Sequence, residues 1–189
     1  MISAPGIYLL RHGETTAGAA FIGSTDAALT EQGWQQMQLA VNNSHFERII
    51  SSPLRRCAIF AEWLGSAQGI SVVYEARWRE IDFGNWEGYT AAELMQTEAE
   101  ALQQLWTEPE TFVLPGGEAI ADFRRRVLAA WSDHGSGNNS QTLIIAHGGV
   151  IRVLLSALYP ERYGSIMQIE VAHGSLHSLD NANTAVSDA

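Results

Sequence analysis

The feature that most constrains the fold is a set of four short apolar runs that are continuous rather than alternating. They are Ile7 to Leu10, Arg48 to Ile50, Ser71 to Tyr74, and Thr142 to Ala146. A strand with one face in water alternates apolar and polar residues, whereas a continuous apolar run fits a strand covered on both faces. The pattern therefore predicts a parallel sheet with helices packed on each side.

Helical patterns lie between these runs, as the crossovers of a parallel sheet require. Thr30 is suited to cap a helix from Glu31 to about Asn42, and Pro53 to start one that runs to about Leu64. Three more segments have helical composition: Tyr89 to Trp106, Glu118 to Asp133, and Val150 to Leu158. Two further strands are predicted as antiparallel edge pieces, near Ile166 to Val171 and Ser175 to Leu179.

We expect a single domain over residues 1–189, because no repeat or linker divides the chain. The stretch from Phe83 to Gly117 is interpreted as a lid-like insertion, and residues 181–189 as a disordered tail. There is one cysteine, no long apolar stretch and no basic leader before the first strand. These features predict a cytoplasmic location.

The charge pattern narrows the possible partners. The net charge is -10, which argues against nucleic acid and anionic membranes as partners. All basic residues are arginine, which excludes Schiff-base chemistry and a lysine-dependent P-loop. Because the planar guanidinium suits phosphate, we expect an anionic small molecule to be bound in a local pocket.

Polar clusters follow the predicted strands. "RHGE", "SSPLRR" and "AHGG" come directly after three of them, and "REIDFG" lies a few residues after the fourth. The carboxyl ends of parallel strands meet at one edge, so His12, His147, Glu80 and arginines should converge there. Glycine follows each histidine and lets the backbone approach a ligand, and a helix after Gly149 would offer N–H groups to an anion. The sequence thus predicts a phosphate site.

Such a site contains the groups for phosphoryl transfer. A neutral imidazole can attack phosphorus, fixed arginines can stabilise the charge on its oxygens, and Glu80 can protonate the leaving oxygen. A metal site built from His12, His147 and Glu80 is the alternative. Arg11 beside His12 would repel a dication, so we expect a metal-independent reaction without a cofactor.

Other chemistry-bearing residues are interpreted more simply. Arg124 to Arg126 are predicted to form a solvated helix face, Cys57 to pack against the sheet, and Trp86 to be the best pocket wall among the tryptophans. The remaining histidines are expected at the surface or in packing, with the last two at most lining a rim: His45, His134, His173 and His177.

Taken together, the motifs resemble those of the histidine phosphatase superfamily, the phosphoglycerate-mutase-like proteins. They are "LLRHGET", "FIGSTDAALTEQG", "ISSPLRRC", "REIDFGNWEG", "LPGGE" and "IAHGGVIRVLL", in an order that covers almost the whole chain. The resemblance implies a three-layer α/β/α sandwich with a mostly parallel central sheet. It also implies a phosphatase or mutase that works through a phosphohistidine.

The resemblance assigns roles residue by residue. His12 matches the phosphorylated nucleophile and Glu80 the proton donor, while Arg11, Arg56 and His147 match the groups that clamp the phosphoryl group. Substrate contacts are implied at Thr15, Gly23 and Gly148. Gly18 stands where many relatives have a phosphate-binding asparagine, so Thr15 or backbone groups are expected to take over that contact.

Within the superfamily, the short chain and its motifs are most similar to α-ribazole-5'-phosphate phosphatases of late cobalamin biosynthesis. Trp78, Trp86 and Trp106 near the predicted lid could stack on an aromatic base. The alternatives are a broad small-molecule phosphatase, a phosphoglycerate-mutase-type phosphotransferase and, in another class, a non-catalytic phosphate-binding module.

Overall fold

The computed structural model describes residues 6–135 and 140–179. Within them, five strands form one sheet in the order β3-β2-β4-β1-β5. The strands are β1 (Ile7–Arg11), β2 (Arg48–Ser51), β3 (Val72–Tyr74), β4 (Thr142–Ala146) and β5 (Leu176–Leu179). All neighbours are parallel except β5, which pairs antiparallel with β1. The predicted parallel sheet with an antiparallel edge strand is confirmed, whereas the predicted tail at 181–189 lies outside the described residues.

The α-helices are α1 (Glu31–Ala40), α2 (Arg55–Gln68), α3 (Ala91–Thr97), α4 (Ala99–Thr107), α5 (Ile120–His134) and α6 (Gly148–Leu158). Short 3-10 turns are η1 (Ala76–Trp78), η2 (Gly84–Trp86), η3 (Pro109–Thr111) and η4 (Ile166–Gln168). The predicted cap of α1 is present, because the Thr30 side chain accepts a hydrogen bond from the Gly33 N–H at 2.9 Å. The helix predicted from Pro53 begins at Arg55 and ends at Gln68, and the next residue, Gly69, terminates it with a φ of 70°.

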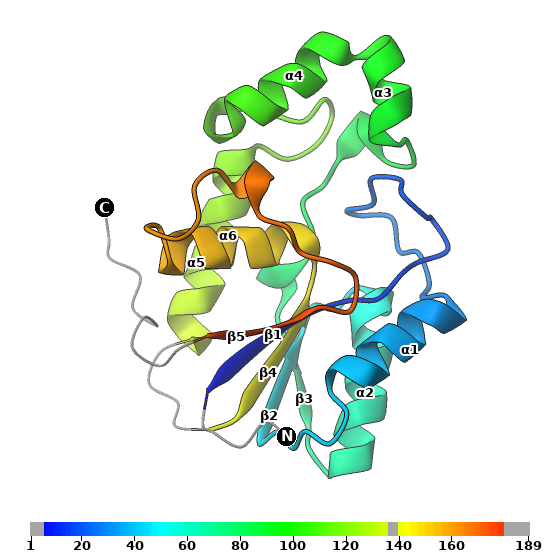
Figure 1. Cartoon of the computed structure of the whole chain (residues 1–189), viewed down its shortest axis with the longest axis vertical. Helices are drawn as coiled ribbons and strands as arrows, with labels where there is room; N and C mark the ends of the chain where they lie inside the picture. The colour runs from blue at the N-terminus through cyan, green and yellow to red at the C-terminus, as the bar shows by residue number, and fades with distance from the viewer. Residues whose placement is uncertain (1–5, 136–139, 180–189) are drawn as a thin grey trace.

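The continuous apolar strands are buried on both faces. Ile7 and Leu9 of β1 face one core cluster with α5 and α6, while Tyr8 and Leu10 face another with α1 and α2. Figure 1 shows the two helix pairs on opposite sides of the sheet. This is the three-layer arrangement that the sequence predicts, since every side chain of β1 needs an apolar partner.

The helical composition of the segment from Tyr89 to Trp106 is confirmed, as α3 and α4, which meet at Glu98, where φ is -133°. One predicted element is wrong. The strand expected from Ile166 to Val171 is instead η4 and an irregular segment. Two carbonyls of that segment accept hydrogen bonds from arginine side chains: Ile169 from Arg152 and Val171 from Arg11. In a strand, these carbonyls would accept from the backbone of a neighbouring strand instead.

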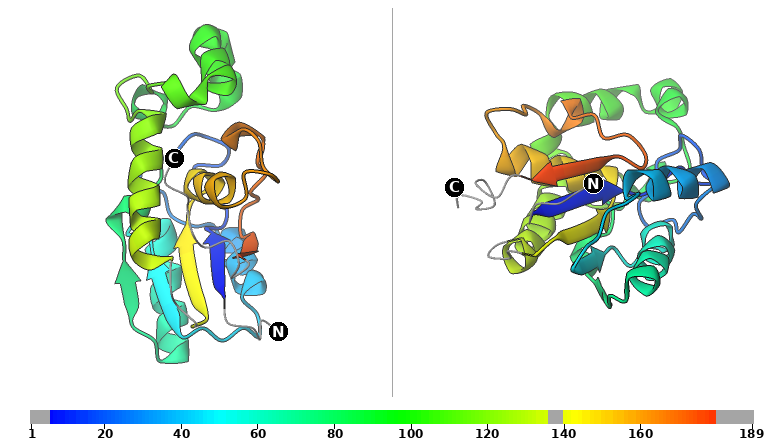
Figure 2. Two further views of the ribbon diagram at one scale, coloured as in Figure 1. Left: turned by 90° about the vertical axis from the view of Figure 1, so that its left-hand side faces the viewer. Right: turned by 60° about the horizontal axis from the view of Figure 1, so that its bottom comes forward.

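The segment predicted as an insertion carries η2, α3, α4 and η3. Its helices stand beyond the sheet, at the top in Figures 1 and 2. Leu102 and Leu105 of α4 are buried in the cluster that also holds α5 and α6. Among the described helices, none is long and apolar enough to cross a membrane.

Candidate active site

Three strand ends meet where the sequence predicts. Register pairs Arg11 of β1 with Ala146 of β4, and Ser51 of β2 with Ile145 of β4. The next residues are therefore neighbours, and the rings of His12 and His147 lie 5.2 Å apart between centroids. The predicted convergence of the two histidines is a direct result of parallel register.

His12 is held as a neutral imidazole with one ring nitrogen available. Its side chain is buried, with 4% exposed, and its Nδ1 lies 2.8 Å from the Gly13 carbonyl oxygen. A carbonyl can only accept, so Nδ1 carries the proton and Nε2 keeps its lone pair. Burial, and then the charge of Arg56, lower the pKa of His12 well below its ordinary value.

His147 is fully buried behind His12 and is fixed by two partners. Arg56 Nε donates to its Nδ1 at 3.2 Å, so the proton is on Nε2, which lies 2.8 Å from Ser52 Oγ. Burial, followed by the charge of Arg56, also lowers the pKa of His147. Cys57 packs beneath the ring with Sγ 3.7 Å from Nε2, as the packing interpretation predicted.

Arg11 joins His12 to a third histidine that the sequence analysis had placed at most on a rim. Its NH2 group donates to His173 Nε2 at 2.8 Å, and its NH1 group to the Val171 carbonyl at 2.5 Å. The ring of His173 lies 5.5 Å from that of His12. Burial, and then Arg11, lower the pKa of His173 to about 4. Within the described residues the buried Nε of Arg11 has no hydrogen-bond partner, and so remains a donor for a ligand.

Glu80 is positioned by the start of α6. Its Oε2 accepts a hydrogen bond from the Gly149 N–H at 3.0 Å. An added Cβ at Gly149 would stand 2.3 Å from Glu80 Oε1, so only glycine permits this close approach. The amide of Gly148 lies in the same first turn, where helix N–H groups lack intrahelical acceptors.

A cavity of about 320 Å³ brings most of these groups together. Of the predicted site residues, it is lined by Arg11, His12, Thr15, Glu80 and Gly148. Arg56 and His147 lie behind this surface, and Gly23 lines a separate polar cavity on the other side of Glu80. The cavity thus has a cation, a neutral imidazole, a carboxylate and a helix N-terminus on its wall, in a chain of strongly negative net charge.

Arg56 and Glu87 hold the loop that forms another wall. The Arg56 guanidinium donates to the carbonyls of Ile22, Gly23 and Thr25. The Glu87 carboxylate accepts from the N–H groups of the same loop, at 2.8 Å from Gly23 and 3.1 Å from Thr25. Arg56 and Glu87 therefore fix this loop from its carbonyls and its N–H groups, and Glu87 is a positioning residue that the sequence motifs did not indicate.

The backbone explains why glycine is tolerated at position 18. Gly18 has φ of 62°, in the left-handed region that glycine and asparagine adopt most readily. An added Cβ would meet no atom within 4 Å, and both Gly18 and the buried Thr15 line the cavity. The cavity wall at position 18 can therefore hold either glycine or asparagine without a change of fold.

The structure corrects the interpretation of Arg126 as a solvated residue. Its side chain is 23% exposed and donates to the carbonyls of Arg77, Arg79 and Glu80 at 2.6, 2.8 and 3.0 Å. It also forms a bidentate ion pair with Glu118, at 2.7 and 2.8 Å. Arg126 therefore fixes the backbone that carries Glu80. Its neighbour Arg125 is exposed, as predicted.

The prediction that Trp86 forms a pocket wall is wrong. Its side chain is 1% exposed and packs in the core against Phe112 and Phe21. Trp78 is also buried, so neither can stack on a ligand, whereas Trp106 of α4 is 44% exposed.

Arg152 lines the cavity, although it was not among the predicted site residues. The sequence signal for it was its spacing of four residues from Gly148, which places both on one face of a helix.

The alternative of a metal site finds no support in the described part of the chain, where no three His, Cys, Asp or Glu side chains form a group that could hold an ion. Arg56 donates a hydrogen bond to His147, and Arg11 donates one to His173. The side chains around His12 thus suit an anion better than a dication.

Fold, motif order and cavity define a member of one superfamily. A profile of the histidine phosphatase superfamily (branch 1) matches residues 7–186, and the chain belongs to this family. It also resembles particular members. The crystal structure of the α-ribazole phosphatase from Shigella flexneri aligns with a TM-score of 0.78 and 26% identity, over 92% of this chain and 89% of that one.

Two further relatives carry other names. A mycobacterial glucosyl-3-phosphoglycerate phosphatase, solved with VO3, has a TM-score of 0.77 and 28% identity, over 94% of this chain and 93% of that one. A protein of Erwinia tasmaniensis named "Probable phosphoglycerate mutase GpmB" is 34% identical over 181 residues, 93% of this chain and 84% of its own. The chain spans about half, 48%, of the length of mycobacterial relatives that are 30% identical over 177 residues.

Proposed function

We propose that the protein is a metal-independent phosphomonoesterase that works through a phosphohistidine on His12. The observation that carries the proposal is the fixed tautomer of His12, which leaves the Nε2 lone pair at a cavity lined by Arg11, Gly148 and Glu80. Its low pKa keeps the imidazole neutral, as a nucleophile must be.

In the first step, Nε2 attacks phosphorus as the bond to the ester oxygen breaks. The Arg11 Nε and the Gly148 amide bind the equatorial oxygens, where charge gathers in the transition state. Arg56 and His147, which lie behind this wall, are assigned to the same phosphate pocket on the motif resemblance. Protonated Glu80 gives its proton to the leaving alkoxide, and the alcohol departs. In the second step, the Glu80 carboxylate takes a proton from water, which attacks the phosphohistidine and releases inorganic phosphate.

The substrate proposed is a small-molecule phosphate ester, with α-ribazole 5'-phosphate or a cobalamin 5'-phosphate favoured. Support comes from the motif resemblance and from the similarity to the Shigella flexneri α-ribazole phosphatase. The specificity constant for α-ribazole 5'-phosphate should exceed those for unrelated sugar phosphates by at least about tenfold, the effect of one well-matched contact. Equal specificity constants across such a panel would exclude this substrate preference and favour a broad small-molecule phosphatase.

A mutase is the second candidate, because relatives bear that name. A mutase needs a bisphosphate to prime the histidine and transfers the phosphoryl group back to its product, so release of inorganic phosphate without a bisphosphate argues for the phosphatase. The third possibility is a phosphate-binding module without turnover. Loss of hydrolysis in a folded His12→Ala variant argues against it, and absence of hydrolysis by the wild type with any ester would support it.

A further inference from the structure

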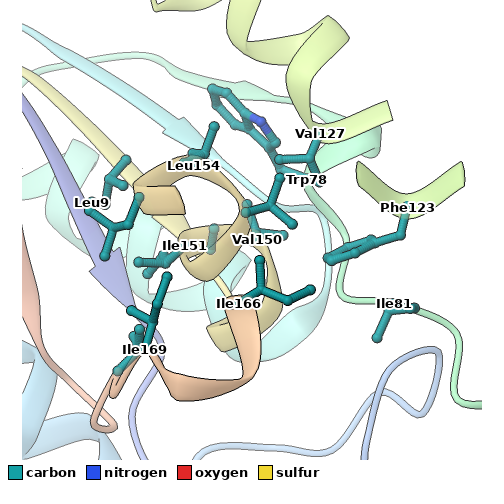
Figure 3. Packing of buried hydrophobic residues seen from close by; sticks show 14 of the residues in the cluster. Leu9, Trp78, Ile81, Phe123, Val127, Val150, Ile151, Leu154, Ile166 and Ile169 are labelled. Carbon is teal, nitrogen blue, oxygen red and sulfur yellow. The ribbon is translucent and has the colours of Figure 1, made fainter. Parts of the chain in front are cut away.

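Beside the catalytic cavity lies a smaller apolar chamber of about 110 Å³. Its apolar wall includes Phe21, Phe83, Leu105, Phe123, Ile166 and Met167. Figure 3 shows Phe123 from α5 and Ile166 from η4 reaching toward the same space. Leu105 belongs to α4, so the helical segment beyond the sheet forms one side of this chamber.

The chamber adjoins the catalytic cavity. Four residues line both: Phe21, Glu80, Phe83 and Arg152. A larger polar cavity of about 440 Å³ also adjoins the site, but of its described lining residues only Glu80 faces the catalytic cavity. Of the two neighbouring cavities, the apolar chamber therefore shares the larger part of its wall with the catalytic cavity.

Charged groups mark the boundary between the two spaces. Arg152 is fixed by a bond from its Nε to the Ile169 carbonyl at 2.8 Å, and Glu80 by the Gly149 N–H at 3.0 Å. An ester oxygen held at this boundary would lie beside the proposed acid, Glu80. The carbon atoms beyond that oxygen would then meet phenylalanine and aliphatic side chains.

We infer that the apolar chamber is a subsite for part of the leaving alcohol, so that between otherwise matched phosphomonoesters the one with an apolar group of at most one ring near the ester oxygen is hydrolysed more efficiently. The volume limits the size of this group: at about 110 Å³ the chamber is smaller than an apolar cavity of roughly 150 Å³ that holds a benzene molecule, so it admits at most one ring. This inference rests on the proposed function and names the class of substrate for the same site.

The test compares benzyl phosphate with ethyl phosphate, because both are esters of primary alcohols and differ chiefly in the apolar ring. Burial of the ring should raise kcat/KM for benzyl phosphate by about tenfold to a hundredfold. Met167→Gln places an amide in the chamber wall and should reduce this ratio several-fold. Met95→Gln is the matched control, since Met95 is 45% exposed on α3 and should leave the ratio unchanged.

Equal kcat/KM values for the two esters would overturn the inference, as would a ratio that Met167→Gln leaves unchanged while the variant melts like the wild type. Calorimetry with benzylphosphonate and methylphosphonate separates this failure from that of the proposed function. If α-ribazole 5'-phosphate, benzyl phosphate and ethyl phosphate are all left unhydrolysed, the proposed function fails. Tighter binding of benzylphosphonate would still support the subsite, and equal binding would refute it.

Discussion

Arg126→Met offers the sharpest test of how the fold positions Glu80. The variant keeps a side chain of similar length over Phe123 but removes three bonds to the carbonyls of residues 77, 79 and 80 and the pair with Glu118. Hydrogen bonds from a charged donor contribute about 1.5–3 kcal/mol each when buried. Because 23% of the side chain is exposed and water can reach the freed carbonyls, we expect a loss of about 3 kcal/mol in all.

Urea denaturation measures this loss. With a slope of about 2 kcal/mol/M, the midpoint should fall by about 1.5 M. Arg125→Met is the matched control, because Arg125 is 75% exposed and its pair with Asp122 should contribute less than about 0.5 kcal/mol. The kcat of Arg126→Met should also fall by about tenfold or more, with a smaller change in KM, as Glu80 loses its fixed backbone. Equal midpoints for the two variants, or an unchanged kcat, would refute the reasoning.

Three other predictions concern Glu75, His12 and the role of metal ions. Glu75 binds Arg77 and His134, and the hydrogen bonds from Arg77 lower the pKa of Glu75 to about 2. The lowered pKa contributes up to about 3 kcal/mol to the free energy of unfolding above pH 4.5, and this contribution disappears as the pH falls toward 2. The unfolding free energies of wild type and Glu75→Gln should therefore converge over that range, and a constant gap would contradict the assignment. The imidazole of His12 should show no titration by NMR between about pH 6 and 8, whereas a midpoint near 6.5 would contradict its neutral burial. Activity should survive exhaustive chelation because arginines surround the site, and strict dependence on an added divalent ion would overturn the metal-free mechanism.

The sequence was sufficient where one local pattern determines one local structure. Continuous apolar runs predicted β1, β2 and β4, since both faces of these strands are buried. Parallel register then brought His12 and His147 together without any knowledge of side-chain contacts. The Thr30 cap was readable for the same reason, because its bond closes within three residues.

What the sequence did not predict depends on long-range partners. Arg126 looks like a surface residue in a run of three arginines, and its role arises from carbonyls 46 to 49 residues away. His173 acquires its place from Arg11, 162 residues earlier in the chain. The segment from Ile166 to Val171 has a strand-like composition, but arginine side chains bind its carbonyls. Neither periodicity nor spacing contains such information.

The central claim is the covalent intermediate on His12, and rapid quenching of the wild type during turnover tests it most directly. With a substrate labelled in its phosphoryl group, followed by peptide mapping, we predict an acid-labile label on His12 that forms and decays at rates compatible with kcat. The His12→Ala variant should carry no label. Turnover without a phosphohistidine, or a label that persists in His12→Ala, would contradict the account.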